Sequence, residues 1–135
     1  MARQFLGGKR FLGTLSWRRR SKHHLRTTLD FLTNYVDKKA PDVIVVTGDL
    51  VQIGLAIEID QAAEWLERLS KIAKVVLVPG NHDFYQADSI EYACEKWAQY
   101  LWPDGNKART FPSVVRVGNT TIIGLSSAQP EPFWS

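Results

Sequence analysis

Apolar residues recur at three- and four-residue spacing in three stretches of the chain, and this spacing is typical of amphipathic helices. The stretches span residues 22–39, 58–73 and 89–101. The middle stretch is the most regular, and its apolar positions are Ile59, Ala62, Ala63, Leu66, Leu69 and Ile72. The spacing therefore predicts three helices.

Two short runs between these helices are apolar at every position. Residues 43–46 read Val-Ile-Val-Val and residues 75–78 read Val-Val-Leu-Val, a composition that suits parallel strands buried on both faces. Residues 114–117 and 120–125 flank a Gly-Asn pair, which indicates a hairpin. The order helix, strand, helix, strand, helix, hairpin predicts an α/β domain whose sheet is flanked by helices.

Length and composition are those of one ordinary globular domain. The chain has 135 residues, of which 44% are hydrophobic and 23% are charged, so it can build a single core. No apolar run approaches the roughly 20 residues that span a bilayer. Cys94 is the only cysteine, which excludes an internal disulfide and a cysteine metal cluster and favours a reducing compartment. We expect a soluble, cytoplasmic protein.

The basic residues are concentrated near the N-terminus. Residues 1–29 contain eight Lys or Arg and no Asp or Glu, whereas the rest of the chain contains nine basic and fourteen acidic residues. We interpret residues 1–19 as a basic N-terminal segment of uncertain structure and residues 20–135 as the domain. Such asymmetry between segments favours contact with an anionic partner.

Several interpretations of this basic segment stay open. Its field could draw an anionic substrate toward a site, or it could lie on an anionic membrane surface with Phe5, Phe11 and Trp17 at the interface, which would make the protein peripheral to a membrane. It could also form a solvated basic face. Contact with nucleic-acid phosphates is a further interpretation, but no specific nucleic-acid motif accompanies the segment.

Each predicted parallel strand runs directly into a glycine-containing loop with polar side chains. Thr-Gly-Asp occupies residues 47–49 and Pro-Gly-Asn-His-Asp occupies residues 79–83. Ligands of open α/β sheets bind beyond the carboxyl ends of the strands, and a right-handed crossover would bring both loops to one edge. Either loop alone could be an ordinary turn. Their pairing, each after a buried strand, favours a site.

The side chains in these loops are suited to binding a divalent metal and to transferring a proton. Asp49 supplies a carboxylate oxygen, Asn81 an amide oxygen and His82 an imidazole nitrogen, a set that suits Mn, Fe or Zn. Asp83 could hold the His82 ring by its other nitrogen and fix the tautomer. A histidine held in this way is a good proton donor to a leaving oxygen.

The stretches VVTGDLV, residues 45–51, and VVLVPGNHD, residues 75–83, resemble the GD and GNHD motifs of the calcineurin-like metallophosphoesterase family. The resemblance implies an α/β/β/α sandwich and a phosphomonoester or phosphodiester hydrolase with two divalent metals, Mn, Fe or Zn. It implies that Asp49 bridges the metals, that Asn81 ligates one, that His82 donates a proton and that Asp83 orients His82.

Two departures from the family pattern lead us to expect a partial domain. The family's first motif, Asp-x-His, is not found before residue 43, and no histidine follows His82 to supply the later ligands. His23 and His24 lie among basic residues that oppose a cation, so they are poor substitutes. We expect little or no activity from the isolated chain, because metal ligands are missing. The alternative is a non-catalytic remnant that acts as a binding or structural module or needs a complementary chain.

Overall fold

The computed structural model describes residues 26–84, 87–105 and 107–128. The chain divides into two compact units, residues 1–39 and residues 40–135. In the first unit the described element is helix α2 (Arg26–Lys39), which confirms the predicted helix 22–39 from residue 26 onward. The predicted boundary between residues 19 and 20 lies outside the described residues and stays a prediction.

Helix α2 ends where local chemistry stops a helix. Ala40 adopts a left-handed φ of 46°, and Pro41 follows it, which disfavours a helical conformation in the preceding residue. The last turn carries Lys38 and Lys39, whose positive charges complement the partial negative charge of the helix C-terminus. The ammonium nitrogen of Lys39 also lies 5.3 Å from the centre of the Tyr35 ring, one turn earlier.

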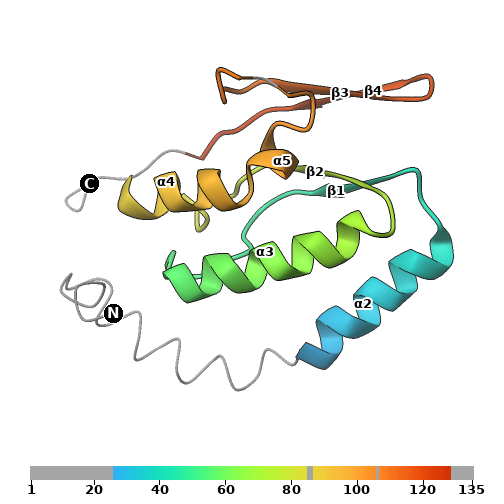
Figure 1. Cartoon of the computed structure of the whole chain (residues 1–135), viewed down its shortest axis with the longest axis horizontal. Helices are drawn as coiled ribbons and strands as arrows, with labels where there is room; N and C mark the ends of the chain where they lie inside the picture. Colours follow the sequence, from blue (N-terminus) through green and yellow to red (C-terminus); the bar gives the residue numbers. More distant parts are fainter. Residues whose placement is uncertain (1–25, 85–86, 106, 129–135) are drawn as a thin grey trace. The chain divides into compact units, whose positions relative to one another are not determined.

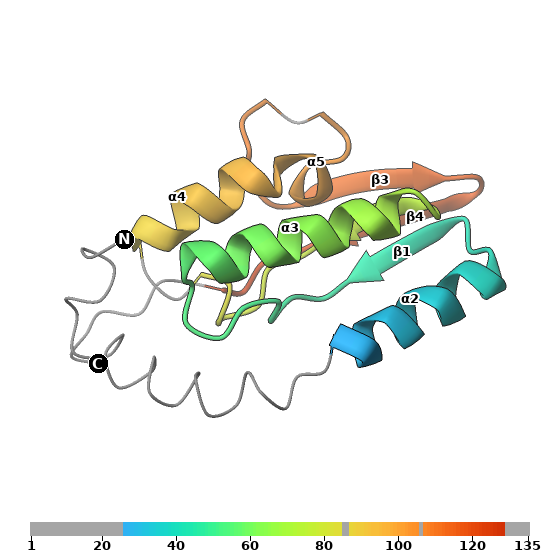
Figure 2. The same ribbon diagram turned by 60° about the horizontal axis from the view of Figure 1, so that its bottom comes forward.

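The second unit begins with a parallel strand pair, β1 (Val43–Val46) and β2 (Lys74–Leu77), connected by helix α3 (Ala56–Ser70). The two strands pair in register from Val43 opposite Lys74 to Val46 opposite Leu77. The sequence prediction gave β1 with these bounds and placed β2 one residue later. Helix α3 lies beside the strand pair (Figures 1 and 2). The predicted strand–helix–strand unit is therefore confirmed.

Strand β1 differs from the prediction that both strands are buried on both faces. Val75, Val76 and Leu77 of β2 are at most 3% exposed, but Val45 of β1 is 48% exposed and the other three β1 residues are half-buried. The reason lies in the packing: helix α3 and the short helix α5 (Ala98–Leu101) make their main strand contacts with β2. The apolar sequence of β1 therefore predicted a strand correctly, but it did not predict how far the two faces of that strand are buried.

The predicted helix 89–101 is divided into α4 (Ala87–Lys96) and α5. The interruption is at Trp97, which has φ −106° and ψ 8°. Trp97 is fully buried, and its indole Nε1–H donates a hydrogen bond of 3.1 Å to the backbone oxygen of Ile59 in α3. We attribute the break to this large side chain, because its indole both packs in the core and reaches a polar partner on the neighbouring helix.

The predicted hairpin is present as β3 (Ser113–Val117) and β4 (Thr120–Gly124), which pair antiparallel from Ser113 opposite Gly124 to Val117 opposite Thr120. Gly118 in the turn has a left-handed φ of 55°. A Cβ atom on Gly124 would lie 3.2 Å from Cγ2 of Val78, the residue that follows β2. The end of β4 therefore lies next to the end of β2.

The core of the second unit is formed mainly by α3, β2, α4 and α5. Its buried members are Val51, Ile59, Ala62, Leu66, Leu69, Val75, Leu77, Ala93, Trp97, Tyr100, Leu101 and Trp102. This packing of helices on a small parallel sheet confirms the α/β prediction. Among the described residues, no helix is long and apolar enough to cross a membrane.

Truncating the core face of α3 should destabilise the fold far more than truncating its outer face. Leu66 is 0% exposed, whereas Ile57 on the same helix is 51% exposed. We expect Leu66→Ala to lower the free energy of unfolding by about 2–5 kcal/mol and Ile57→Ala to change it by about 0.5 kcal/mol or less. Urea unfolding followed by circular dichroism measures both variants, and equal losses would contradict this core.

Candidate functional site

The loops after β1 and β2 meet at the carboxyl edge of the parallel pair, near the start of α3 (Figure 1). Their backbones touch at two glycines. A Cβ atom on Gly48 would lie 2.7 Å from Cα of Gly80 and 2.8 Å from the carbonyl carbon of Pro79. A Cβ atom on Gly80 would lie 2.7 Å from the backbone nitrogen of Asp49. Any other residue at either position would push the loops apart. The predicted meeting of the two loops is therefore present.

One buried carboxylate ties the two loops together. Asp83 is 0% exposed, and its Oδ2 accepts hydrogen bonds from the backbone N–H groups of Asp49 at 2.8 Å and Gly80 at 2.9 Å. Its Oδ1 accepts the backbone N–H groups of Leu50 at 2.8 Å and Val51 at 3.1 Å. Three of the donors belong to the loop after β1 and one to the loop after β2. Asp83 therefore fixes the distance between the loops.

Two opposing effects act on the Asp83 carboxyl group. Burial is the larger effect and raises its pKa, because a charged carboxylate is disfavoured away from water, and the four backbone N–H donors offset part of that rise. All four donors need an acceptor, and only the ionised carboxylate offers two acceptor-only oxygens. The two loops together therefore supply the environment in which this charge can be buried.

The sequence hypothesis that Asp83 holds the His82 ring differs from the structure. Nδ1 of His82 lies 2.7 Å from the backbone oxygen of Gln52, while both Asp83 oxygens accept backbone N–H groups. A carbonyl oxygen only accepts, so Nδ1 carries the proton and donates it. Nε2 is then the nitrogen through which His82 can accept or deliver a proton. The backbone oxygen of Gln52 therefore helps to orient the ring.

Asp49 and Asn81, the two predicted metal ligands, lie on the adjoining loops with exposed side chains. Asp49 has a left-handed φ of 56°, a conformation that Asp and Asn adopt more readily than most residues. Its Oδ1 accepts a hydrogen bond of 3.3 Å from the backbone N–H of His82. The carboxylate of Asp49 is thus linked to the loop after β2 and remains open to solvent.

The donor chemistry of this edge fits part of a divalent-metal shell. Asp49 and Asn81 offer exposed oxygens of the kind that Mn, Fe or Zn accept, whereas the Asp83 oxygens are occupied by backbone donors. Among the described residues, no three His, Cys, Asp or Glu side chains gather closely enough to hold a metal ion. Asp49 and Asn81 can therefore supply two ligands to a divalent metal. A complete coordination shell needs additional ligands.

Sequence reasoning missed Glu58, a second buried carboxylate close to the loops. Glu58 is 7% exposed, and its Oε2 accepts backbone N–H groups of Ile53 and Leu55 at 3.2 and 3.0 Å. Glu is the residue expected three positions after an N-cap. Leu55 occupies the N-cap in place of the usual Ser, Thr, Asp or Asn. The sequence therefore offered no signal for the start of this helix or for the hydrogen bonds of Glu58.

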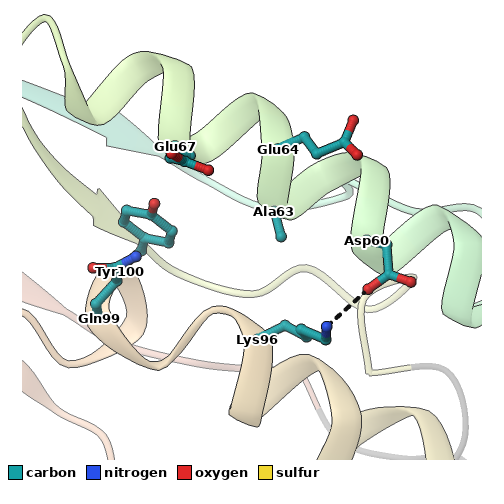
Figure 3. A pocket seen from close by; sticks show the side chains of 7 residues that line it. All are labelled: Asp60, Ala63, Glu64, Glu67, Lys96, Gln99 and Tyr100. Atoms are coloured by element: carbon teal, nitrogen blue, oxygen red, sulfur yellow. Dashed lines mark ion pairs between the residues drawn. The ribbon is translucent and has the colours of Figure 1, made fainter.

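A hollow on the second unit lies away from these loops, between α3 and the α4–α5 segment (Figure 3). It has a volume of about 480 Å³, and its lining residues are Asp60, Ala63, Glu64, Glu67, Lys96, Gln99 and Tyr100. Lys96 forms an ion pair of 3.2 Å with Asp60, which also accepts a hydrogen bond of 2.8 Å from the Tyr92 hydroxyl. Three carboxylates against one ammonium disfavour a phosphate, so this hollow is not part of the candidate site.

The buried position of Asp83 predicts a contrast between two identical substitutions. Asp83→Asn leaves one acceptor oxygen for four N–H donors and turns an amide NH₂ toward two of them. We expect it to lower the free energy of unfolding by about 2–4 kcal/mol. Asp49→Asn should change it by about 0.5 kcal/mol or less, because that side chain is exposed and Asn suits a left-handed backbone. Denaturant unfolding measures both, and a neutral Asp83→Asn would show that the carboxylate does not hold the loops.

Comparison with known proteins agrees with the geometry of this edge. The family model for calcineurin-like phosphoesterases matches residues 21–128 of the chain, a span that includes both loops, all the described strands and α2 to α5. No solved structure matches the chain. The α/β architecture and the GD and GNHD loops at the ends of parallel strands are those that this family leads one to expect. The chain belongs to the calcineurin-like phosphoesterase family.

Proposed function

We propose that the protein takes part in the metal-dependent hydrolysis of a phosphomonoester or phosphodiester, at the edge formed by the loops after β1 and β2. Membership in the calcineurin-like phosphoesterase family supports a phosphoester substrate. The observation that carries the proposal is the hydrogen-bonding of both loops to Asp83, which holds Asp49, Asn81 and His82 at one edge of the sheet.

Asp49 and Asn81 are the residues that would hold divalent metal, either Mn, Fe or Zn. When bound, a pair of such ions supplies an activated water and neutralises charge on the phosphate. The Asp49 carboxylate is exposed next to the loop after β2, a position that suits the bridging role expected in this family. We propose that further ligands come from residues other than those the structure describes or from a complementary chain.

His82 is the residue we assign to proton transfer. Its Nδ1–H is held on the Gln52 carbonyl, so its Nε2 is the nitrogen that can present a proton to the leaving oxygen of the substrate. The proton leaves from the imidazolium form of the ring, which carries a proton on each nitrogen, and the neutral ring that remains keeps its Nδ1–H hydrogen bond to Gln52. The ring therefore does not need to rotate during the transfer, and Asp83 contributes by holding the loop from which His82 projects.

The basic segment at residues 1–19 supports a further part of the proposal. Its Lys and Arg side chains, with no acidic residue before Asp30, would attract an anionic substrate or an anionic membrane surface. The single cysteine of the chain agrees with a reducing, cytoplasmic location. We propose a cytoplasmic protein in which this segment faces the anionic partner.

A second candidate function is a non-catalytic binding or structural module. The observation that favours it is the incomplete ligand set: Asp49 and Asn81 are two oxygen donors, and no cluster of three or more His, Cys, Asp or Glu is found in the described part of the chain. Such a module would keep the fold and the loop contacts through Asp83 but would bind a phosphoester without hydrolysing it.

The direct test is hydrolysis of a chromogenic phosphodiester with Mn²⁺ by the wild-type chain and two variants. We expect weak, metal-dependent hydrolysis that a chelator abolishes and that Asp49→Asn lowers at least tenfold, since even residues that only support a metal ligand cost about 10–100-fold. Asp42→Asn is the matched control, because Asp42 is exposed just before β1 and should leave the rate unchanged. Hydrolysis that survives Asp49→Asn would contradict the assigned site, and binding without any hydrolysis would favour the module.

A further inference from the structure

The segment between the GD loop and helix α3 is held by buried carboxylates at both ends. Asp83 accepts the backbone N–H groups of Leu50 and Val51, and Glu58 accepts those of Ile53 and Leu55. Gln52 is the residue between these two sets of hydrogen bonds. Its backbone oxygen lies 2.7 Å from Nδ1 of His82.

We propose that Glu58 is a positioning residue for His82: it fixes the Gln52 carbonyl in place and so selects the imidazole tautomer that carries its proton on Nδ1. Glu58 acts on His82 only through the main chain. Its carboxylate accepts hydrogen bonds from the backbone N–H groups of Ile53 and Leu55, and the carbonyl that accepts the hydrogen bond from the His82 ring belongs to Gln52. The effect of Glu58 on catalysis rests on the function proposed above, but its effect on the His82 tautomer does not depend on that function.

The local geometry explains why this segment needs Glu58. Gly54, between the two N–H groups that Glu58 accepts, has a left-handed φ of 69°, and glycine gives the segment more conformational freedom than any other residue. Ile53 and Leu55 are 6% and 4% exposed, so water is a poor substitute acceptor for their N–H groups. The first turn of α3 further favours a negative side chain at position 58. Removal of the Glu58 carboxylate would therefore free the Gln52 carbonyl to move away from the His82 ring.

One oxygen of Glu58 makes both bonds, which gives the test its design. Oε2 accepts Ile53 N–H at 3.2 Å and Leu55 N–H at 3.0 Å. Glu58→Gln retains one acceptor oxygen at the same side-chain length, so it should keep both backbone hydrogen bonds and the contact between the Gln52 carbonyl and His82. Glu58→Met has a similar length and no oxygen, so it should lose these hydrogen bonds and weaken that contact. Glu64→Met is the matched control, because Glu64 lies on the same helix with an exposed side chain.

The experiment is two-bond ¹H–¹⁵N NMR of the full chain with ¹⁵N-labelled histidine, at a pH where the imidazoles are neutral. The chain has three histidines, and a His82→Gln variant identifies the signal of His82. In the wild type, in Glu58→Gln and in Glu64→Met we expect His82 to carry its proton on Nδ1. In Glu58→Met we expect the population of the Nδ1–H form of His82 to fall and that of the Nε2–H form to rise.

Each outcome decides the proposal. A proton on Nε2 in the wild type, or loss of the Nδ1–H form in Glu58→Gln, overturns it, and so does a folded Glu58→Met that keeps this form. If Glu58→Met does not fold, Glu58→Asp takes its place, because its carboxylate is one methylene shorter and should not reach both N–H groups; a Glu58→Asp chain that keeps the Nδ1–H form in full overturns the proposal. Hydrolysis is measured separately: a chain with the expected tautomers and no hydrolysis would contradict the proposed function and leave the role of Glu58 standing.

Discussion

The carboxylate of Asp83 accepts four backbone hydrogen bonds from two loops whose bonded residues lie as many as 34 positions apart in the sequence. The rest of the candidate site depends on this interaction. It brings the backbone of Asp49 against that of Gly80, and it fixes the direction in which the loop carrying Asn81 and His82 leaves β2. An ionised group in the interior is unfavourable unless its hydrogen bonds are satisfied, so the carboxylate and the two loops stabilise one another only in this arrangement.

A site for phosphate chemistry benefits from such an arrangement. Charged and polar groups stabilise a transition state best when they are already in position and need not reorganise during the reaction. Here two buried carboxylates, Asp83 and Glu58, hold the backbone from Asp49 to Leu55. The Gln52 carbonyl within that stretch holds the His82 ring. The exposed groups at the edge are therefore supported by buried ones that need not touch a substrate.

Much of this architecture follows from the sequence, because short apolar strands and the glycine-containing loops at their ends leave clear patterns. The hydrophobic runs located β1 and β2 within one residue, and the topology rule for parallel strands located the edge where Asp49 and Asn81 lie. Backbone hydrogen bonding leaves no such pattern. The bonds of Asp83 to main-chain N–H groups, the Gln52 carbonyl on His82 and the role of Glu58 depend on atoms that every residue shares, so the side chains alone pointed to a different partner for His82. The exposure of Val45 also depends on packing that the strand sequence does not encode.

Native-state amide hydrogen exchange on the uniformly labelled chain tests the central claim most directly, since it reports on each N–H group that Asp83 accepts. The account predicts that the amides of Asp49, Leu50, Val51 and Gly80 are all protected, although none lies in a helix or strand, and that they exchange with a common opening free energy. Rapid exchange at these four positions, alongside protected amides in β2, would contradict the account.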